Sequence, residues 1–196
     1  FTCSAAGFEG SLSSYKPAPT TDCPSVDDPL LSRPAPNVGS CDHTDFSVKD
    51  GSFTIEPGVY CGGLLIDNEA KVEMKPGTYI INGGEFRIRN DGSLKGEGVG
   101  IYFTGSDGRA VFDGTSDISL TAPINGEMAG LLFFQDRAMP ETEYEISSKN
   151  ASVLLGTIYL PNGRLKVHAN NPVANASAFT VIVARYLDIG QKAQLF

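Results

Sequence analysis

Closely spaced carboxylates are the residues of this sequence best suited to bind a metal ion. Asp107, Asp113 and Asp117 lie in one short polar stretch, and hard oxygen ligands at close spacing are those that Ca²⁺ prefers. Asp107 and Asp113 each precede a glycine, however, and Asp-Gly pairs are typical of turns. The spacing also matches neither an EF-hand loop nor a nonapeptide calcium repeat. We therefore interpret the three residues as turn formers, with calcium binding as the alternative, and expect no other cofactor.

The sequence contains no familiar catalytic motif. We interpret the glutamates of Glu141–Glu145 as a solvated loop or the guard of a sheet edge, not as an acid/base pair. His43 and His168 lie far apart in the sequence, and both are expected at the surface. There is no Gly-x-Ser-x-Gly elbow, phosphate loop or dinucleotide fingerprint. The chain is therefore predicted not to be an enzyme, and no catalytic residue is assigned.

All four cysteines, Cys3, Cys23, Cys41 and Cys61, lie in the first third of the chain. No Cys-x-x-Cys pair occurs, which argues against a zinc site. An even number of cysteines in a Gly- and Pro-rich chain predicts two disulfides. Three connectivities are open, and pairing Cys3 with Cys23 and Cys41 with Cys61 is favoured because each bond then closes a local loop. Disulfides indicate an oxidising compartment, the periplasm or the cell exterior.

Charge and hydropathy argue against two classes of partner. The chain holds 15 basic and 23 acidic residues, a net charge of -8, and lacks the basic stripe of a nucleic-acid-binding protein. No apolar run approaches the roughly 18 residues needed to span a bilayer. Because the sequence begins at Phe1 and not at Met, we expect any signal peptide or membrane anchor to lie upstream. Membrane contact is expected only through such an anchor.

Composition divides the chain near residue 50. Residues 1–50 contain a Pro-rich stretch with a proline every few positions, which excludes helix and favours a polyproline-like ribbon. Its cystines and apolar anchors such as Leu30 and Leu31 are predicted to pin this irregular segment to a larger domain, one end of which it would cap. Residues 51–196 are predicted to form that domain.

Short apolar runs recur at intervals beyond residue 50. In one repeat two apolar residues flank a polar turn, at 66–72, 88–94, 112–118, 146–153 and 187–193. A second repeat is a run rich in β-branched and aromatic residues, at 77–80, 100–103, 130–134, 156–160 and 179–183. Continuous apolar runs of this kind are typical of buried parallel strands. The connections between them are too short for crossover helices.

Two strand repeats per unit predict an all-β fold, a parallel β-helix (solenoid) of about five coils. Stacked coils would bury one interior ladder, formed by Val72, Leu94, Ile118 and Val153. Asn68 and Asn90 occupy equivalent turn positions, where a left-handed backbone or a ladder of stacked side chains is useful. The uneven spacing of the repeats keeps open an alternative fold, an antiparallel β-sandwich or jelly roll.

Seven phrases of the sequence carry a resemblance to a known family. They are Cys23–Leu30, Leu31–Pro36, Cys41–Phe46, Pro57–Gly63, Pro76–Tyr79, Ala129–Arg137 and Gly156–Pro161. In this order they resemble the C-terminal region of TadG-like proteins, which belong to the Tad/Flp pilus-assembly systems of bacteria. The resemblance implies an exported envelope or surface module of tight adherence and pilus biogenesis, and it supplies no catalytic residues. Gln135, Asp136 and Arg137, within one of the shared phrases, are interpreted as structural.

Together, the residues and the resemblance predict a non-enzymatic structural or adhesive module at the cell surface. Its partners would be other pilus or envelope proteins, or further copies of the chain, reached through the solenoid ends. Because the last strand ends without a polar tail, Leu195 and Phe196 are predicted to contact the partner. One alternative is a β-helix that binds or cleaves carbohydrate and contacts surface glycans. Another is a subunit of a homopolymeric surface fibre.

Overall fold

The structure is a computed structural model that describes the chain except for residues 1–2, 6, 13–16, 25–26, 191–192 and 196. It divides into two compact units, Phe1–Pro34 and Ala35–Phe196. The described residues form strands and turns, without an α-helix. In the first unit β1 (Cys3–Ser4) pairs in parallel with β2 (Thr20–Thr21), and a disulfide joins Cys3 to Cys23.

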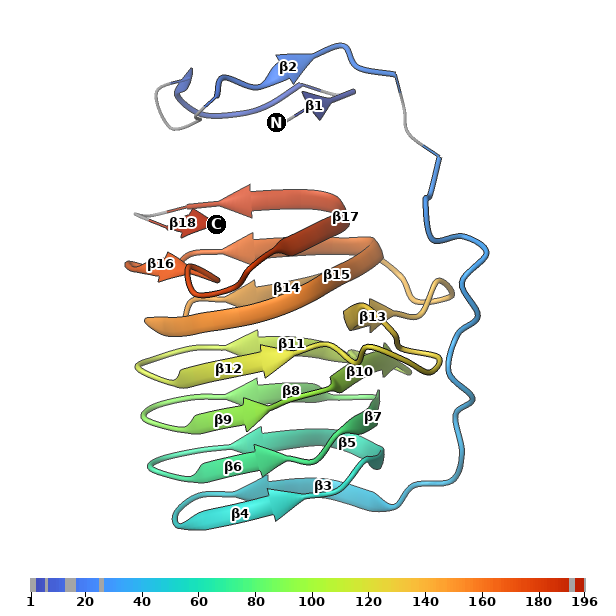
Figure 1. The fold of residues 1–196 in the computed structure, drawn as a ribbon, viewed down its shortest axis with the longest axis vertical. Coiled ribbons are helices and arrows are strands. Elements are labelled where there is room, and N and C mark those ends of the chain that lie inside the picture. The colour runs from blue at the N-terminus through green and yellow to red at the C-terminus, as the bar shows by residue number, and fades with distance from the viewer. Residues whose placement is uncertain (1–2, 6, 13–16, 25–26, 191–192, 196) are drawn as a thin grey trace. The chain divides into compact units, whose positions relative to one another are not determined.

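The second unit is a parallel β-helix of about seven coils, stacked one above another (Figure 1). Its strand pairs all run parallel in the described part of the chain, which excludes the antiparallel sandwich. Successive coils place their strands in three ladders, which we call faces A, B and C in the order in which the chain passes through them. Because side chains alternate along each strand, every second residue points into a core enclosed by the three faces.

Each face receives one strand segment from every coil. Face A contains the first parts of β3 (His43–Val48), β5 (Gly58–Ile66) and β17 (Thr180–Ile189), the middle of β15 (Asn150–Val167), and β7 (Gly77–Asn82), β10 (Val99–Thr104) and β13 (Leu131–Gln135). Face B contains the last parts of β3, β5, β15 and β17, with β8 (Glu85–Ile88), β11 (Arg109–Phe112) and β14 (Thr142–Ile146). Face C contains β4 (Ser52–Ile55), β6 (Lys71–Met74), β9 (Ser93–Gly96), β12 (Asp117–Thr121), the first part of β15, β16 (Pro172–Val173) and β18 (Gln194–Leu195).

The structure has about seven coils where the repeats predicted about five. The two coils missing from the prediction turn from face B to face C at residues 48–53 and 167–173. The first lies partly before residue 51, the predicted start of the solenoid, yet β3 already pairs with β5. The second ends in β16, which begins at Pro172, and proline weakens the strand signal of a sequence.

The interior ladder predicted from the repeats is present with one change. Val72 pairs with Leu94 and Leu94 pairs with Ile118, and none of the three is more than 3% exposed. Ile118 then pairs with Ala151, not with Val153, because the register between β12 and β15 shifts after Ile118. Ala151 is fully buried and Val153 is half-buried, so the small residue continues the ladder.

Two buried tyrosines show how the core accommodates polar atoms. Tyr60 and Tyr79 are fully buried and stack with ring centroids 6.0 Å apart. The hydroxyl of Tyr60 donates to the backbone oxygen of Glu56 (2.8 Å). The single proton of the Tyr79 hydroxyl is shared between the backbone oxygens of Ile55 (2.8 Å) and Lys75 (2.9 Å). Burial raises the pKa of Tyr60 to about 12 and raises the pKa of Tyr79 as well. Both therefore act as neutral donors that fasten a corner of the coil.

Residues with a left-handed backbone turn the corners. Asn68 and Asn90 have φ values of 51° and 58°, which confirms the conformation expected at these equivalent positions. At the corner between faces A and B, Gly62 and Gly84 lie in adjacent coils with φ values of 79° and 74°. A Cβ atom on Gly84 would collide with the carbonyl oxygen of Gly62, so glycine is required for the coils to stack there.

The second disulfide joins Cys41 to Cys61, so the structure has the pairing that the sequence favoured. Cys41 lies just before β3 and Cys61 lies in β5. The neighbouring Asp42 reinforces the link, because its carboxylate accepts a hydrogen bond from the backbone nitrogen of Val59 (2.8 Å). The backbone nitrogen of Asp42 also donates to the carbonyl oxygen of Val59 (2.9 Å). These bonds fasten the first coil to the second.

Candidate functional site

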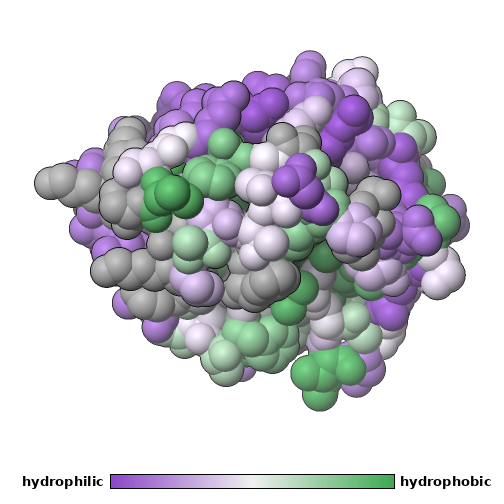
Figure 2. All heavy atoms as spheres, turned by 90° about the horizontal axis from the view of Figure 1, so that it is seen from above, coloured by the Kyte–Doolittle hydropathy of each residue, from purple (hydrophilic) through white to green (hydrophobic). Residues whose placement is uncertain are grey.

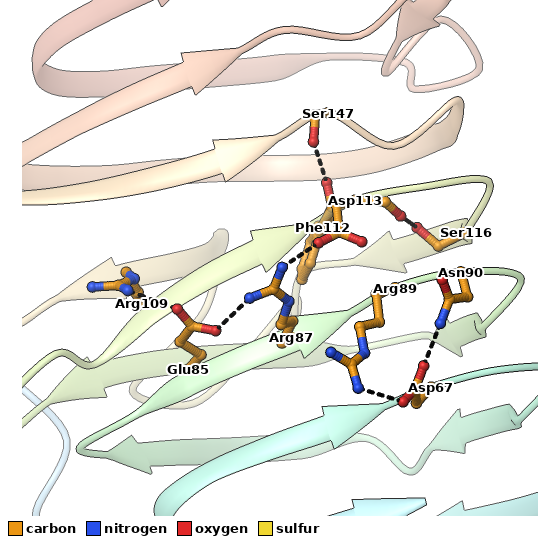
Figure 3. A network of polar contacts seen from close by, with 10 residues as sticks. All are labelled: Asp67, Glu85, Arg87, Arg89, Asn90, Arg109, Phe112, Asp113, Ser116 and Ser147. Atoms are coloured by element: carbon orange, nitrogen blue, oxygen red, sulfur yellow. Dashed lines mark hydrogen bonds and ion pairs between the residues drawn. The ribbon is translucent and has the colours of Figure 1, made fainter. Parts of the chain in front are cut away.

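The outer side of face B carries charged side chains that pair with one another (Figure 3). Outward positions recur at every second residue, and parallel pairing places equivalent positions of successive coils side by side. Glu85 lies between two arginines, 3.2 Å from Nη1 of Arg87 and 2.6 Å from Nη2 of Arg109. Nη2 of Arg87 lies 2.7 Å from a carboxylate oxygen of Asp113 in the next coil. We call these residues the charge network of face B.

Asp67 is a buried carboxylate at the end of β5, only 4% exposed. It accepts hydrogen bonds from Nη2 of Arg89 (2.7 Å) and Nδ2 of Asn90 (2.6 Å), both in the next coil. Its Oδ1 also accepts a hydrogen bond from the backbone nitrogen of Asn68 (2.8 Å). The bond from Arg89, followed by those from the backbone and Asn90, lowers the pKa of Asp67 to about 2. The carboxylate thus joins two coils in its charged form.

The three candidate calcium ligands are not brought together. Asp113 is paired with Arg87, and the carboxylate of Asp107 is 77% exposed and lies 3.6 Å from Arg109. Asp117 is exposed at the start of β12. Across the described ranges, no group of three or more His, Cys, Asp or Glu side chains is arranged to hold a metal ion. Asp107 has a φ of 61°, a left-handed backbone conformation typical of turns, which agrees with its interpretation as a turn former.

The acidic stretch Glu141–Glu145 contributes to ion pairs between coils. Glu141 lies 3.6 Å from Nη2 of Arg164, and Glu143 lies 3.6 Å from Nζ of Lys166. Both partners belong to the adjacent coil, which β15 forms on face B. These carboxylates therefore extend the alternation of charge along the face.

The two histidines have different surroundings. His168 is partly exposed, and its Nε2 lies 3.1 Å from a carboxylate oxygen of Asp188 in the next coil. His43, expected at the surface, is instead half-buried, with its ring stacked on Tyr60 at a centroid distance of 4.7 Å. It also contacts the ring of Phe46 at 5.2 Å. The surface prediction missed this because His43 is paired in register with Tyr60 and shares its inward orientation.

The residues after β13 build the corner between faces A and B in the fifth coil. Gln135 is fully buried at the end of β13. Asp136 accepts a hydrogen bond from Oγ1 of Thr104 (2.7 Å) and another from the backbone nitrogen two residues on (2.9 Å). The guanidinium of Arg137 lies over the ring of Phe134, 5.0 Å from its centroid. Each of the three has a structural contact, which agrees with the structural interpretation of this phrase.

The outer surface is grooved, and two of its grooves cross faces B and C. One, of about 440 Å³, lies on face B next to the corner formed by Gly62 and Gly63. Its polar walls include Asp45, Ser47, Glu85, Arg87 and Arg89. The Nε atoms of both arginines are buried without a hydrogen-bond partner. The other groove, of about 610 Å³, crosses face C, and its polar walls include lysines and glutamates of β6 and the segments that follow β6 and β9.

The last coil leaves apolar side chains uncovered. Leu187 and Ile189 of β17 are 47% and 43% exposed, whereas the residues paired with them one coil earlier, Leu165 and Val167, are 1% and 0% exposed. Their exposure arises because the described part of the chain contains no further coil to stack on them. Figure 2 shows one face of the molecule, on which hydrophobic (green) and hydrophilic (purple) residues both occur. We call the exposed side chains of β17 and its N-terminal flank, namely Phe179, Val181, Tyr186, Leu187 and Ile189, the end surface.

The end surface is a functional candidate that the sequence located only approximately. Leu195 and Phe196 were predicted to make the partner contact. The backbone of Leu195 lies in β18 and pairs with Val173, and Phe196 lies outside the described residues. Leu187 and Ile189 looked like ordinary core, because inward residues of the last coil have the same apolar pattern as those of any other coil. Only the stacking order reveals that they are exposed.

Comparison with models of protein families, with curated proteins and with solved structures gives no match. The resemblance to TadG-like proteins therefore remains a prediction from the sequence. In the part of the chain that the structure describes, no helix has the length and apolar character needed to cross a membrane. The two disulfides are compatible with a periplasmic or extracellular location.

Proposed function

We propose that this chain is a non-enzymatic, exported structural or adhesive module of the bacterial cell surface, associated with Tad-type pilus assembly or adherence. It works as a stiff support whose end surface contacts another protein. The partners are pilus or envelope components. Any attachment to the membrane is made by a segment outside this chain.

The observation that carries the proposal is the exposure of the end surface. Five large apolar side chains lie on one coil, and each is at least 39% exposed. Strand β17 also offers an edge of unpaired backbone donors and acceptors, to which another strand can be added. Face B offers less, because its charges are largely satisfied by one another. Paired surface charges keep a face soluble and contribute little binding energy.

The test is made in the bacterium that encodes the chain. The gene is deleted, or replaced by a variant with Leu187→Asp and Ile189→Asp, and pili and surface-attached cells are counted. A matched control carries Ile124→Asp, because Ile124 is 94% exposed and lies in the loop between β12 and β13, away from β17. We expect attachment to fall with the deletion and with the β17 variant, at unchanged protein level, and to persist in the control. Normal piliation and attachment after deletion would refute the proposal.

Carbohydrate binding is the second candidate function, and the groove of face B favours it. Its volume of about 440 Å³ is in the range of small-ligand sites, and arginine and carboxylate side chains in its walls suit the hydroxyl and acidic groups of a glycan. Binding is measured on an array of surface polysaccharides, with Arg89→Ala as the groove variant and Lys95→Ala on face C as the control. Specific binding lost only with Arg89→Ala would support this function, and release of sugar fragments would identify an enzyme.

A further inference from the structure

The two ends of the solenoid match each other in a way that identifies a partner for the end surface. Among the described residues, the first coil, β3 and β4, pairs only with the second, and on faces A and B the last coil pairs only with the sixth. Both ends therefore present unpaired parallel strand edges with the same direction and outline. A parallel strand edge is satisfied by another parallel strand in register.

The corner between faces A and B is the most specific point of this match. In β3 a single residue, Asp45, separates the part paired on face A from the part paired on face B. In β17 a single residue, Arg185, does the same. The other coils use at least two residues at this corner, for example Gly62 and Gly63 in β5. The first and last coils thus share a tight corner that lets their edges follow the same path.

The charges at these two corners are opposite. Asp45 and Arg185 are both exposed, and neither has an ion-pair partner among the described residues. The two coils also differ in net charge. Residues 42–56 contain four carboxylates and one lysine, whereas β17 contains one arginine and one carboxylate, so the first coil is acidic and β17 is neutral. Complementary charge at matching positions sets the register of an interface and opposes the wrong pairing.

Inward residues complete the match. On face B the inward side chains of the last coil are Leu187 and Ile189, and the equivalent side chains of the first coil are Phe46 and Val48. Phe53 of the first coil, an inward residue of face C, is 41% exposed. Val48 is only 6% exposed and Phe46 is half-buried, so the inward apolar side chains that lack neighbours are chiefly Phe53 at the first coil and Leu187 and Ile189 at the last.

From these observations we infer that the end surface binds the first coil of a second copy of this chain, head to tail, with Arg185 of one copy beside Asp45 of the next. The contact continues the three faces from copy to copy. Because it joins two different surfaces without closing into a ring, it produces linear assemblies. This inference rests on the proposed role of the end surface and names its partner.

The test uses the full chain and measures mass by sedimentation over a wide range of protein concentration. We expect the wild type to form multiples of 20.8 kDa as the concentration rises. Arg185→Glu and Asp45→Lys should each weaken association by about tenfold or more, because like charges then meet at the corner. Mixing the two variants should restore association, since the carboxylate introduced in one variant then meets the ammonium group introduced in the other. Circular dichroism verifies that each variant is folded.

Leu187→Glu tests the apolar part of the contact, with Ile124→Glu as the matched control. We expect association to be lost in the first and kept in the second. A wild-type chain that stays monomeric at every concentration, or charge variants that do not rescue each other on mixing, would overturn the inference. The proposed function fails separately: attachment unaffected by gene deletion refutes it even if the purified chain assembles. A monomeric chain whose β17 variant still reduces attachment refutes only the self-association.

Discussion

At the scale of single residues, Asp67 shows how a polar group stabilises this fold from within a corner. It is 4% exposed, and hydrogen bonds from Arg89 and Asn90 of the next coil hold its carboxylate. A buried carboxylate is tolerated only when its oxygens are satisfied, and here the partners belong to the neighbouring coil. The stacking of these two coils is therefore most stable when the Asp67 carboxylate is ionised.

The first prediction concerns stability in acid. The pKa of Asp67 is about 2 in the folded chain, below its ordinary value of 3.8. Ionised Asp67 therefore adds stability above about pH 4, and this contribution is lost as the pH falls from 3.8 through 2. Asp67→Asn should lower the free energy of unfolding by about 1–2 kcal/mol at pH 6 and by little at pH 2. Urea denaturation at several pH values measures the difference. Asp50→Asn, an exposed control, should leave stability unchanged, and a deficit independent of pH would contradict the account.

The second prediction compares two glycines with similar backbones. Gly84 and Gly126 have φ values of 74° and 82°, so alanine at either position incurs the left-handed cost of about 1 kcal/mol. A Cβ atom on Gly126 would meet no heavy atom within 4 Å, whereas one on Gly84 would collide with the carbonyl of Gly62. Gly84→Ala should therefore lower the free energy of unfolding by about 3 kcal/mol or more, and Gly126→Ala by about 1 kcal/mol. Equal losses in chemical denaturation would show that the coils do not stack as closely at this corner as described.

At the scale of elements, the two disulfides have the same loop length and different roles. Each closes a sequence separation of 20 residues, one within Phe1–Pro34 and one between the start of the first coil and β5. Only the bond between Cys41 and Cys61 connects elements of the solenoid. The other belongs to a unit that holds two strands of two residues each.

The third prediction follows from this difference. Replacing Cys41 and Cys61 by serine should lower the free energy of unfolding of the solenoid by about 3 kcal/mol, as expected for a loop of this length. Replacing Cys3 and Cys23 by serine provides a control of equal loop length and should leave that transition in place. Thermal unfolding followed by circular dichroism in the far ultraviolet, where β-structure absorbs, measures both. A larger loss with the Cys3 and Cys23 variant would contradict the division into two units.

The sequence predicted the type of the elements better than their number. Continuous apolar runs and short turns identified parallel strands, and equivalent asparagines identified the corner between faces B and C. Two coils were not counted, because their turns depart from the repeat. The turn at 48–53 is one residue shorter than those at 66–72, 88–94 and 112–118, and the turn at 167–173 contains Pro172. Long-range pairing also shifted the ladder from Val153 to Ala151, which no local pattern encodes. Element type depends on local periodicity, whereas register depends on the neighbouring coil.

At the scale of the whole molecule, stability should vary along the axis of the solenoid. Each coil contacts mainly its neighbours, so coils in the middle have two stacking partners and the end coils have one. The six residues of β10 in the fourth coil are all buried, whereas half of the residues in β17 are exposed. Local opening is easiest where few apolar contacts must be broken.

The fourth prediction is a gradient of hydrogen exchange along this axis. Backbone amides of β10 should exchange slowest, and those of β17 and β4 should exchange fastest among the strands of the solenoid. Exchange followed by mass spectrometry of peptides resolves these strands. If the chain assembles head to tail, raising the protein concentration should slow exchange in β17 and β4 and leave β10 unchanged. Uniform protection of all coils in a monomeric sample would contradict the quasi-linear description.

The stacking order of the coils determines which residues form the candidate site, and for this reason the site was only partly predictable from the sequence. The sequence indicated that a solenoid end would be the contact surface, and it selected Leu195 and Phe196 because they come last. The structure indicates β17, because exposure depends on which inward residues lack a further coil, and that depends on stacking order. The inferred contact between Asp45 of one copy and Arg185 of the next was equally unpredictable, since the two residues are far apart in sequence and lie at opposite ends of the solenoid.

The loop at residues 122–130 has a practical consequence. It joins β12 to β13 where earlier coils make the same passage with only residues 97–98 or 75–76. β12 still pairs with β9 and β13 still pairs with β10, so the long excursion leaves both ladders in register. The fold thus already accommodates a natural insertion at this level. A foreign peptide grafted beside Gly126 would be displayed at a fixed height on the rod, and this makes the solenoid a scaffold for presenting epitopes at a chosen spacing.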